Sequence, residues 1–212
     1  MLCAACTLIL VGIGTSVRAD SSHFAGPYIA IQAGPAGLAI DGAQNGGADA
    51  VTGNTTASAG AAVIVAGAEV GYAIPIGASF VLDIGASIID GAASVRTETT
   101  DTAADPNVKA VVSDFVTYYV APTIVLSDTA SLYFKYGATS ANVRVVGDVN
   151  DPGGIHGTVM AVGTRTVLPS GIFIRAEAGY TDYDNITTQG KGNDIAATTK
   201  YHADPEVAYG MI

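Results

Sequence analysis

Polar and apolar residues alternate with a period of two along most of the chain. The stretch GIFIRAEAGYTDYDNIT, from Gly171 to Thr187, shows the pattern clearly. Successive side chains of a β-strand point to opposite faces, so Ile172 and Ile174 would share one face while Arg175 and Glu177 share the other. One face of this stretch is therefore apolar, and the opposite face carries charges of both signs.

Eight runs show this alternation, and each is long enough for a tilted, membrane-crossing strand of about 9 to 11 residues. They cover Pro27 to Ile40, Ala61 to Ile74, Phe80 to Val95, Ala110 to Leu126, Leu132 to Val145, Ile155 to Leu168, Ile172 to Asp184 and Tyr201 to Ile212. The links alternate between long segments, such as DGAQNGGADAVTGNTTASAG, and short ones, such as PIGAS, SDTAS and PSG. Outer-membrane barrels have short turns at one end and longer loops at the other, an alternation that a soluble sandwich has no reason to show. The pattern predicts an all-β fold, an eight-stranded antiparallel up-and-down transmembrane β-barrel, with a secreted soluble β-sandwich as the rival.

Charged residues inside the runs gather on the face opposite the large apolar side chains. Buried charges are tolerated when they are paired and hydrogen-bonded, so we expect a structural charge network in the lumen and the isoleucines in lipid. The predicted network comprises Glu69, Asp83, Lys135, Arg165, Arg175, Glu177 and Glu206. In the last run this places Glu206 inside and Val207, Tyr209 and Met211 outside.

Two runs fit the alternation less well. The fourth run has apolar residues on both faces and Asp114 near its outer end, which leaves its register open. The first run contains Pro35, which cannot donate a ladder hydrogen bond and is awkward in a closed barrel.

Composition agrees with one exported domain. The 212 residues are 49% apolar and only 13% charged, and the segment MLCAACTLILVGIGTSVRAD has an apolar core before a small-x-small cleavage site at Val17-Arg18-Ala19. These features predict a signal peptide over residues 1–19 and a barrel domain over 20–212, with a short N-terminal membrane anchor as the alternative. Both cysteines lie in the predicted signal. Removing Arg18 leaves 8 basic against 19 acidic residues, a net charge of −11 that argues against nucleic acid as a partner.

Two segments resemble a known family. FAGPYIAIQAGP is similar to the F-x-G-x-Y-x-G opening strand of small Gram-negative outer-membrane proteins, and IRAEAGYTDYDNI is similar to their seventh strand. The chain thus resembles the porin-family or opacity-type outer-membrane β-barrels, which are similar in build to OmpX and the OmpA transmembrane domain. The resemblance implies location in the bacterial outer membrane, contact with its lipids and lipopolysaccharide, and insertion by the barrel-assembly machinery. One departure is the last residue, Ile212, where that family has an aromatic residue.

Eight strands enclose an interior only wide enough for side chains, so we expect a side-chain-filled lumen rather than an open pore. The predicted function is a small structural barrel whose surface loops contribute to envelope integrity or surface contact, through a loop partner that the sequence does not identify. A narrow channel for ions or small solutes is the first alternative, and a lipid A-modifying enzyme is the second. His156-Gly157-Thr158 resembles the His-x-Ser of lipid A deacylases, but threonine replaces the serine.

Sites for metals and cofactors are not predicted. His23 and His202 lack metal-ligand spacing to a neighbour. Asp148, Asn150 and Asp151 offer oxygen atoms to a hard cation, but their order does not match an EF-hand, and we interpret the segment as a turn. We therefore expect neither a cofactor nor catalytic residues.

Overall fold

The structure is a computed structural model of the chain, and it describes residues 20–45, 55–96, 109–193 and 197–212. Residues 1–19, 46–54, 97–108 and 194–196 lie outside the described residues; they comprise the predicted signal, the middle of the first long link, nearly all of the second and part of the last. No helix within the described part is long and apolar enough to cross a membrane.

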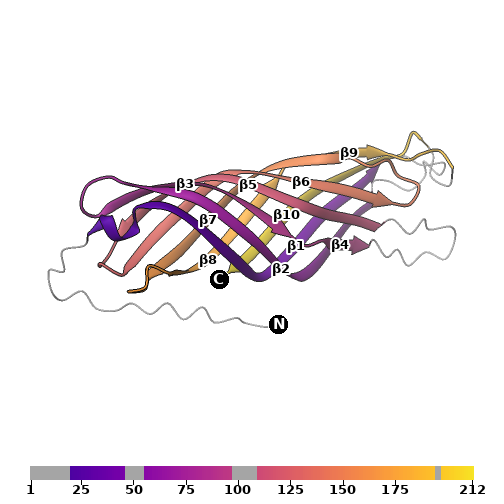
Figure 1. The fold of residues 1–212 in the computed structure, drawn as a ribbon. Helices are drawn as coiled ribbons and strands as arrows, with labels where there is room; N and C mark the ends of the chain where they lie inside the picture. The colour runs from indigo at the N-terminus through magenta and orange to yellow at the C-terminus, as the bar shows by residue number, and fades with distance from the viewer. Residues whose placement is uncertain (1–19, 46–54, 97–108, 194–196) are drawn as a thin grey trace.

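Antiparallel strands make up almost the entire described chain (Figure 1). After a short 3-10 helix, η1 (Ser21–Phe24), come β1 (Gly26–Asn45), β2 (Thr55–Pro75), β3 (Phe80–Asp90), β4 (Ala93–Arg96), β5 (Lys109–Val125), β6 (Ala130–Val146), β7 (Gly153–Val167), β8 (Phe173–Tyr183), β9 (Ile186–Gln189) and β10 (Lys200–Met211). Eight of these strands form a closed ring in the order β1-β2-β3-β5-β6-β7-β8-β10, and β10 pairs again with β1. β4 continues the third run beyond Gly91 and pairs with β5, while β9 follows β8 and pairs with β10. The predicted eight-stranded up-and-down barrel is confirmed.

The ring closes between β1 and β10 through an unusually tight seam. Ala33 and Ile212 exchange two backbone hydrogen bonds of 2.9 and 3.0 Å, and regular pairing continues from Ala36 opposite Tyr209. Pro35 lies between these points, where its missing N–H removes a possible bond. Its neighbour Gly34 lies so close to β10 that an added Cβ would overlap the carbonyl oxygen of Gly210. The seam therefore requires glycine at position 34.

A β-bulge in β5 explains why the fourth run showed no single apolar face. The pairing of β5 with β6 shifts by one residue between Ser113 and Val116, and Asp114 adopts a positive φ of 56°. One extra residue in a strand reverses which side chains face inward. Val112 is buried before the bulge, whereas Tyr119 is buried after it.

The outward-facing side of the barrel changes character along the strands. Near η1 and the short turns 76–79, 126–129 and 168–172, which we call the short-turn half, this side is apolar and exposed. Representative exposed side chains are Ile29, Ile31, Ile64, Ile84, Phe134, Val162 and Ile174. Farther along, each strand of the ring presents an exposed polar residue, and we call this set the polar collar. It consists of Asp41, Ser58, Asp90, Asp114, Asn142, His156, Asp182 and Glu206.

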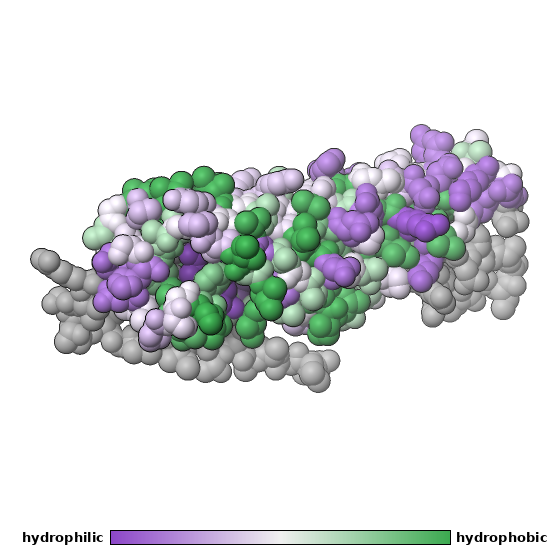
Figure 2. Space-filling view, viewed as in Figure 1, coloured by the Kyte–Doolittle hydropathy of each residue, from purple (hydrophilic) through white to green (hydrophobic). Residues whose placement is uncertain are grey.

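The interior changes in the opposite sense. Charged side chains fill the short-turn half, whereas an apolar cluster fills the half that carries β4 and β9, which we call the long-link half. The buried members of this cluster are Leu38, Ala93, Val112, Ala141, Val143, Ile155, Tyr183 and Ile186. Figure 2 shows most apolar residues on the outside of the short-turn half and most hydrophilic residues toward the opposite end. The short-turn half is thus suited to lipid, and the long-link half to water.

Replacing Gly34 by alanine tests the seam. We expect Gly34→Ala to lower the free energy of unfolding by about 1–3 kcal/mol, because β1 must move away from β10 to fit the methyl group. Urea-induced unfolding of the protein in lipid vesicles measures this change. Gly37→Ala is the matched control on the same strand, since its Cβ would lie 3.9 Å from the Ala208 carbonyl oxygen, an ordinary contact. Equal stability of the two variants would contradict the tight seam.

Candidate functional site: the charged interior

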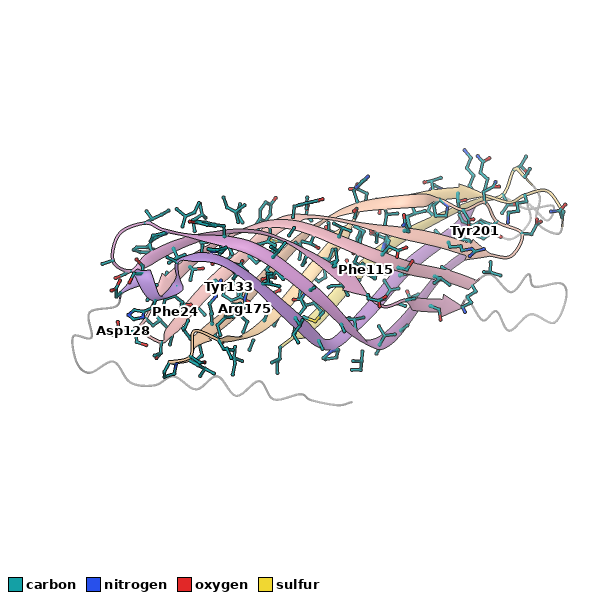
Figure 3. The ribbon with its side chains drawn as sticks, viewed as in Figure 1. Phe24, Phe115, Asp128, Tyr133, Arg175 and Tyr201 are labelled. Atoms are coloured by element: carbon teal, nitrogen blue, oxygen red, sulfur yellow. The ribbon has the colours of Figure 1, made fainter. Side chains whose placement is uncertain are left out.

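Six of the seven predicted network residues converge inside the short-turn half. They come from five strands, with Glu69 on β2, Asp83 on β3, Lys135 on β6, Arg165 on β7, and Arg175 and Glu177 on β8. All are buried except Arg175, whose side chain is still only 10% exposed. Figure 3 shows Arg175 beside Tyr133 inside this half, well away from Tyr201 at the opposite end. The alternation of each strand brings these residues together, because each occupies an inward position.

Lys135, Arg175 and two glutamates form the centre of the network. Lys135 Nζ lies 3.2 Å from Glu69 Oε2 and 2.6 Å from Glu177 Oε2. Arg175 also contacts both carboxylates, with Nη1 bonded to Glu69 and Nη2 lying 3.8 Å from Glu177. Each cation thus bridges two carboxylates, which ties β2, β6 and β8 together across the lumen.

Arg165 and Asp83 form a separate buried pair nearer the short turns. Arg165 Nη2 donates to Asp83 Oδ1 at 2.9 Å, and Thr123 donates its hydroxyl to Asp83 Oδ2 at 2.8 Å. Together with the central group, the network contains three cations and three carboxylates. It is therefore electrically balanced, as a buried set of charges needs to be.

Four tyrosines that the sequence analysis did not assign to the network complete it. Tyr133 and Tyr209 donate to Glu177 at 2.8 and 3.1 Å. The hydroxyls of Tyr28 and Tyr119 lie 2.8 Å apart. Lys135 Nζ lies 4.4 Å from the centre of the Tyr119 ring, and the Arg175 guanidinium lies 4.5 Å from that of Tyr133. The tyrosine rings stabilise the two cations through cation–π contacts, and the tyrosine hydroxyls add hydrogen bonds to the carboxylate of Glu177.

Each of these four rings lies over a glycine on the neighbouring strand. The directly paired residues are Tyr28 with Gly71, Tyr119 with Gly85, Tyr133 with Gly163 and Tyr209 with Gly179. A Cβ on any of these glycines would overlap the tyrosine ring. The sequence does contain glycines at inward positions, which could have pointed to these four tyrosines. Pairing each glycine with its tyrosine, however, requires the register of the neighbouring strands.

The short 3-10 helix closes the lumen below the charges. Asp20 caps η1 by accepting a hydrogen bond of 2.9 Å from the Ser22 N–H, which holds the pKa of the Asp20 carboxyl below its usual range. Ser21 bonds to the turn at Gly77 and Ala78. Phe24 is thereby held inside the barrel mouth, where it packs against Ala73, Val81 and Val125.

Above the charges, a cavity of about 60 Å³ lies on the barrel axis. Its floor is formed in part by Lys135 and Glu177, and its wall by Leu38, Val63, Val65, Ile89, Phe115, Val159, Tyr183, Val207 and Met211. Every strand of the ring contributes to this lining. The lumen thus runs from an apolar stopper at η1 through the charge network to an apolar chamber.

The prediction for Glu206 is wrong. Glu206 is exposed on the outer side of β10, opposite Asp182 of β8, and belongs to the polar collar. Val207, Tyr209 and Met211 face inward instead, while the small residues Ala208 and Gly210 face outward. The sequence analysis assigned the larger apolar residues of the run to lipid. In the structure the Tyr209 hydroxyl reaches Glu177, which favours the opposite orientation.

The remaining candidates do not form a site in the described residues. His156 is exposed on the outer side of β7, and no described carboxylate is hydrogen-bonded to its ring. Asp148 lies in the link between β6 and β7, where its carboxylate accepts from the Asn193 side chain at 2.7 Å and from the Asn193 backbone at 3.0 Å. Within the described ranges, no group of three or more His, Cys, Asp or Glu side chains could hold a metal ion.

Removing Lys135 tests the central group. We expect Lys135→Met to lower the free energy of unfolding by about 3–5 kcal/mol, because it leaves two buried carboxylates with Arg175 as their only cation in the central group. Urea titration in vesicles measures the loss. Lys200→Met, at an exposed position on β10, is the control and should change stability little. A loss as small as that of the control would contradict a cooperative network.

The Arg165–Asp83 pair provides a second test. Arg165→Met alone leaves a buried, unpaired carboxylate and should be strongly destabilising. The double variant Arg165→Met/Asp83→Asn removes both charges and keeps an acceptor for Thr123, so it should recover most of the lost stability. The same unfolding titration compares wild type, both single variants and the double variant. Additive losses would contradict the pairing.

Comparison with solved structures supports the barrel fold. No protein-family model matches the chain, and no curated protein matches it. Among solved structures, the outer membrane protein OprG from Pseudomonas aeruginosa is similar over 92% of this chain and 97% of that chain, with a TM-score of 0.57 and 14% identity. Ail of Yersinia pestis covers 85% of this chain and 98% of its own, with a TM-score of 0.34 and 10% identity. Neisserial surface protein A covers 87% and 97%, with a TM-score of 0.34 and 11% identity. By its fold, the chain is a small eight-stranded β-barrel of the bacterial outer-membrane type.

Proposed function

We propose that this protein is a structural outer-membrane barrel whose lumen is plugged by side chains and whose long links act at the cell surface. The observation that carries the proposal is the balanced network of three cations and three carboxylates across the short-turn half. These residues, the tyrosines between them and the Phe24 stopper occupy the space that a conducting path would need. The interior is therefore suited to holding the barrel rigid rather than to transport.

The outer surface supports an orientation in which the short-turn half lies in the membrane and the long links lie at the cell surface. The apolar side of the short-turn half meets lipid, and the polar collar marks where the strands leave it. Strands that continue beyond the collar, such as the outer parts of β5, β6 and β10, lift the long links away from the membrane. In this arrangement the protein contributes to envelope integrity or to surface contact, with lipids and lipopolysaccharide around the short-turn half and a partner for the links still to be identified. Export through the signal at 1–19 and insertion by the barrel-assembly machinery are part of the same proposal.

Protease accessibility on intact cells tests the orientation. Lys191 and Lys200 are exposed in the long-link half, while Lys135, Arg165 and Arg175 are shielded inside the barrel. We expect trypsin added to whole cells to cleave at Lys191 or Lys200 and to leave the three interior sites intact, as read by mass spectrometry of the fragments. Protection of all sites in intact cells, with cleavage only after lysis, would indicate the reverse orientation.

Conductance in planar bilayers tests the plug. The purified wild-type protein should show no steady open-channel steps, because charged side chains that are paired across the lumen leave no continuous water path. Arg175→Met should lower thermal stability without opening a conducting state, since Lys135 still bridges Glu69 and Glu177. Arg144→Met, at an exposed outward position, controls for the loss of a cation. Stable single-channel steps in the wild type would overturn the plug and favour a narrow channel.

A further inference from the structure

The backbone nitrogen of Asp20 lies beside the short turn that joins β5 to β6. It donates a hydrogen bond of 3.2 Å to Asp128 Oδ1 in that turn. Figure 3 shows Asp128 at the same end of the barrel as Phe24, the stopper of the mouth. All ion pairs formed by the described residues lie inside the barrel, and none of them involves Asp128. The Asp128 carboxylate therefore faces the start of η1 without a lysine or arginine partner among the described residues.

Both sides of this contact are held in place by other bonds. Ser21 donates its N–H to the Ala78 carbonyl at 2.9 Å and its hydroxyl to the Gly77 carbonyl at 2.6 Å. In the turn, Ser127 Oγ accepts from the Ala130 N–H at 3.1 Å. An exposed ion pair gains little when two long, free side chains have to be ordered first. Here the nitrogen belongs to the backbone and the carboxylate to a short side chain on a bonded turn, so this cost is small.

The same nitrogen belongs to the peptide bond at which the predicted signal ends. Hydrolysis of the Ala19–Asp20 bond adds one water molecule, leaves a carboxylate on Ala19 and frees the α-amine of Asp20. An α-amine is mostly protonated at neutral pH, so cleavage replaces a neutral N–H donor by an ammonium group. The side chain of Asp20 is already engaged, because its Oδ1 accepts from the Ser22 N–H at 2.9 Å. The new positive charge therefore faces Asp128.

We propose that the α-ammonium of Asp20, released by removal of residues 1–19, forms an ion pair with Asp128 and thereby fastens η1 across the short-turn mouth. Phe24 follows in the same short element and packs inside the mouth, so fastening Asp20 also holds the stopper in place. A chain that starts at another residue would offer Asp128 only a neutral N–H or no donor. The inference rests on the signal cleavage proposed above, and it makes closure of the mouth depend on that processing step.

The ion pair can be tested with chains that differ only at the N-terminus and at position 128. One recombinant chain begins at Asp20, and a second carries two added glycines before it, which move the ammonium away but keep the Asp20 N–H. Asp128→Asn is made in both chains, and all four proteins are refolded into lipid nanodiscs. The readout is the hydrogen-exchange protection factor of the Ala25 amide, which donates to the Ser22 carbonyl at 3.3 Å. One helical turn does not persist alone, so this amide reports whether η1 is docked.

We expect the added glycines and Asp128→Asn each to lower this protection about threefold, a change typical of an exposed ion pair. Together they should lower it no further than either change alone, because both remove the same interaction. Asp184→Asn, at an exposed position directly after β8, is the matched control and should leave the Ala25 amide unchanged. The Asn150 amide, bonded to the Gln189 carbonyl at 2.9 Å in the long-link half, should exchange equally in all proteins. Heat-dependent mobility on SDS gels confirms that each protein folds.

Three results would overturn the ion pair: no effect of Asp128→Asn, effects of the two changes that multiply, or an effect of Asp128→Asn without one of the added glycines. The last result would mean that the neutral N–H bond is sufficient. N-terminal sequencing of the protein isolated from outer membranes tests the processing step, with Asp20 as the expected first residue. Any other first residue would overturn that step. Conductance and protease accessibility test the proposed function separately, so its failure and the failure of this inference are distinguishable.

Discussion

The ion pairs inside the short-turn half are the interaction on which the rest of the structure depends. A barrel whose outer side is apolar has to place its charged side chains inside, and there each charge needs a partner because water cannot solvate it freely. Lys135 and Arg175 both form ion pairs with the same two glutamates, and Arg165 forms an ion pair with Asp83. The tyrosines around them add hydroxyl donors and ring faces, and the glycines opposite make room for the rings. The need to pair these buried charges thus constrains the strand register and the packing of the interior together.

The second constraint is the change of solvent along the barrel. In the short-turn half the polar side is inside and the apolar side is outside, and beyond the polar collar this order reverses. Leu38 and Tyr183 are buried in the long-link half, whereas Asp41 and Asp182 on the same strands are exposed there. A strand whose inward residues were polar along its whole length could not suit both environments. In β5 the bulge at Asp114 changes which positions face inward. In the other strands the same positions face inward throughout, but they carry polar residues in the short-turn half and apolar residues in the long-link half.

Much of this fold could be predicted from the sequence, because alternation and link length depend on local pattern alone. The inward positions of Glu69, Asp83, Lys135 and Glu177 follow from the apolar residues beside them in their own runs. Glu206 could not be placed in this way, since its run has apolar residues on both faces and its orientation depends on the seam with β1 and on Tyr209. The bulge at Asp114 and the tyrosine–glycine pairs likewise depend on a neighbouring strand, which a single run does not reveal. The cavity depends on side chains from the whole ring and was not predicted.

The polar collar divides the outer side of the barrel into a part suited to lipid below it and a part suited to water above it. The chain contains no tryptophan, so a single introduced tryptophan reports its own surroundings. Phe134 and Asn142 both face outward on β6, one in the short-turn half and the other in the collar. The most direct measurement is quenching by brominated lipid of Phe134→Trp and Asn142→Trp in reconstituted vesicles. Strong quenching at position 134 and little at 142 is the expected result, whereas equal quenching at both positions, or none at either, would mean that the polar collar does not mark the edge of the lipid.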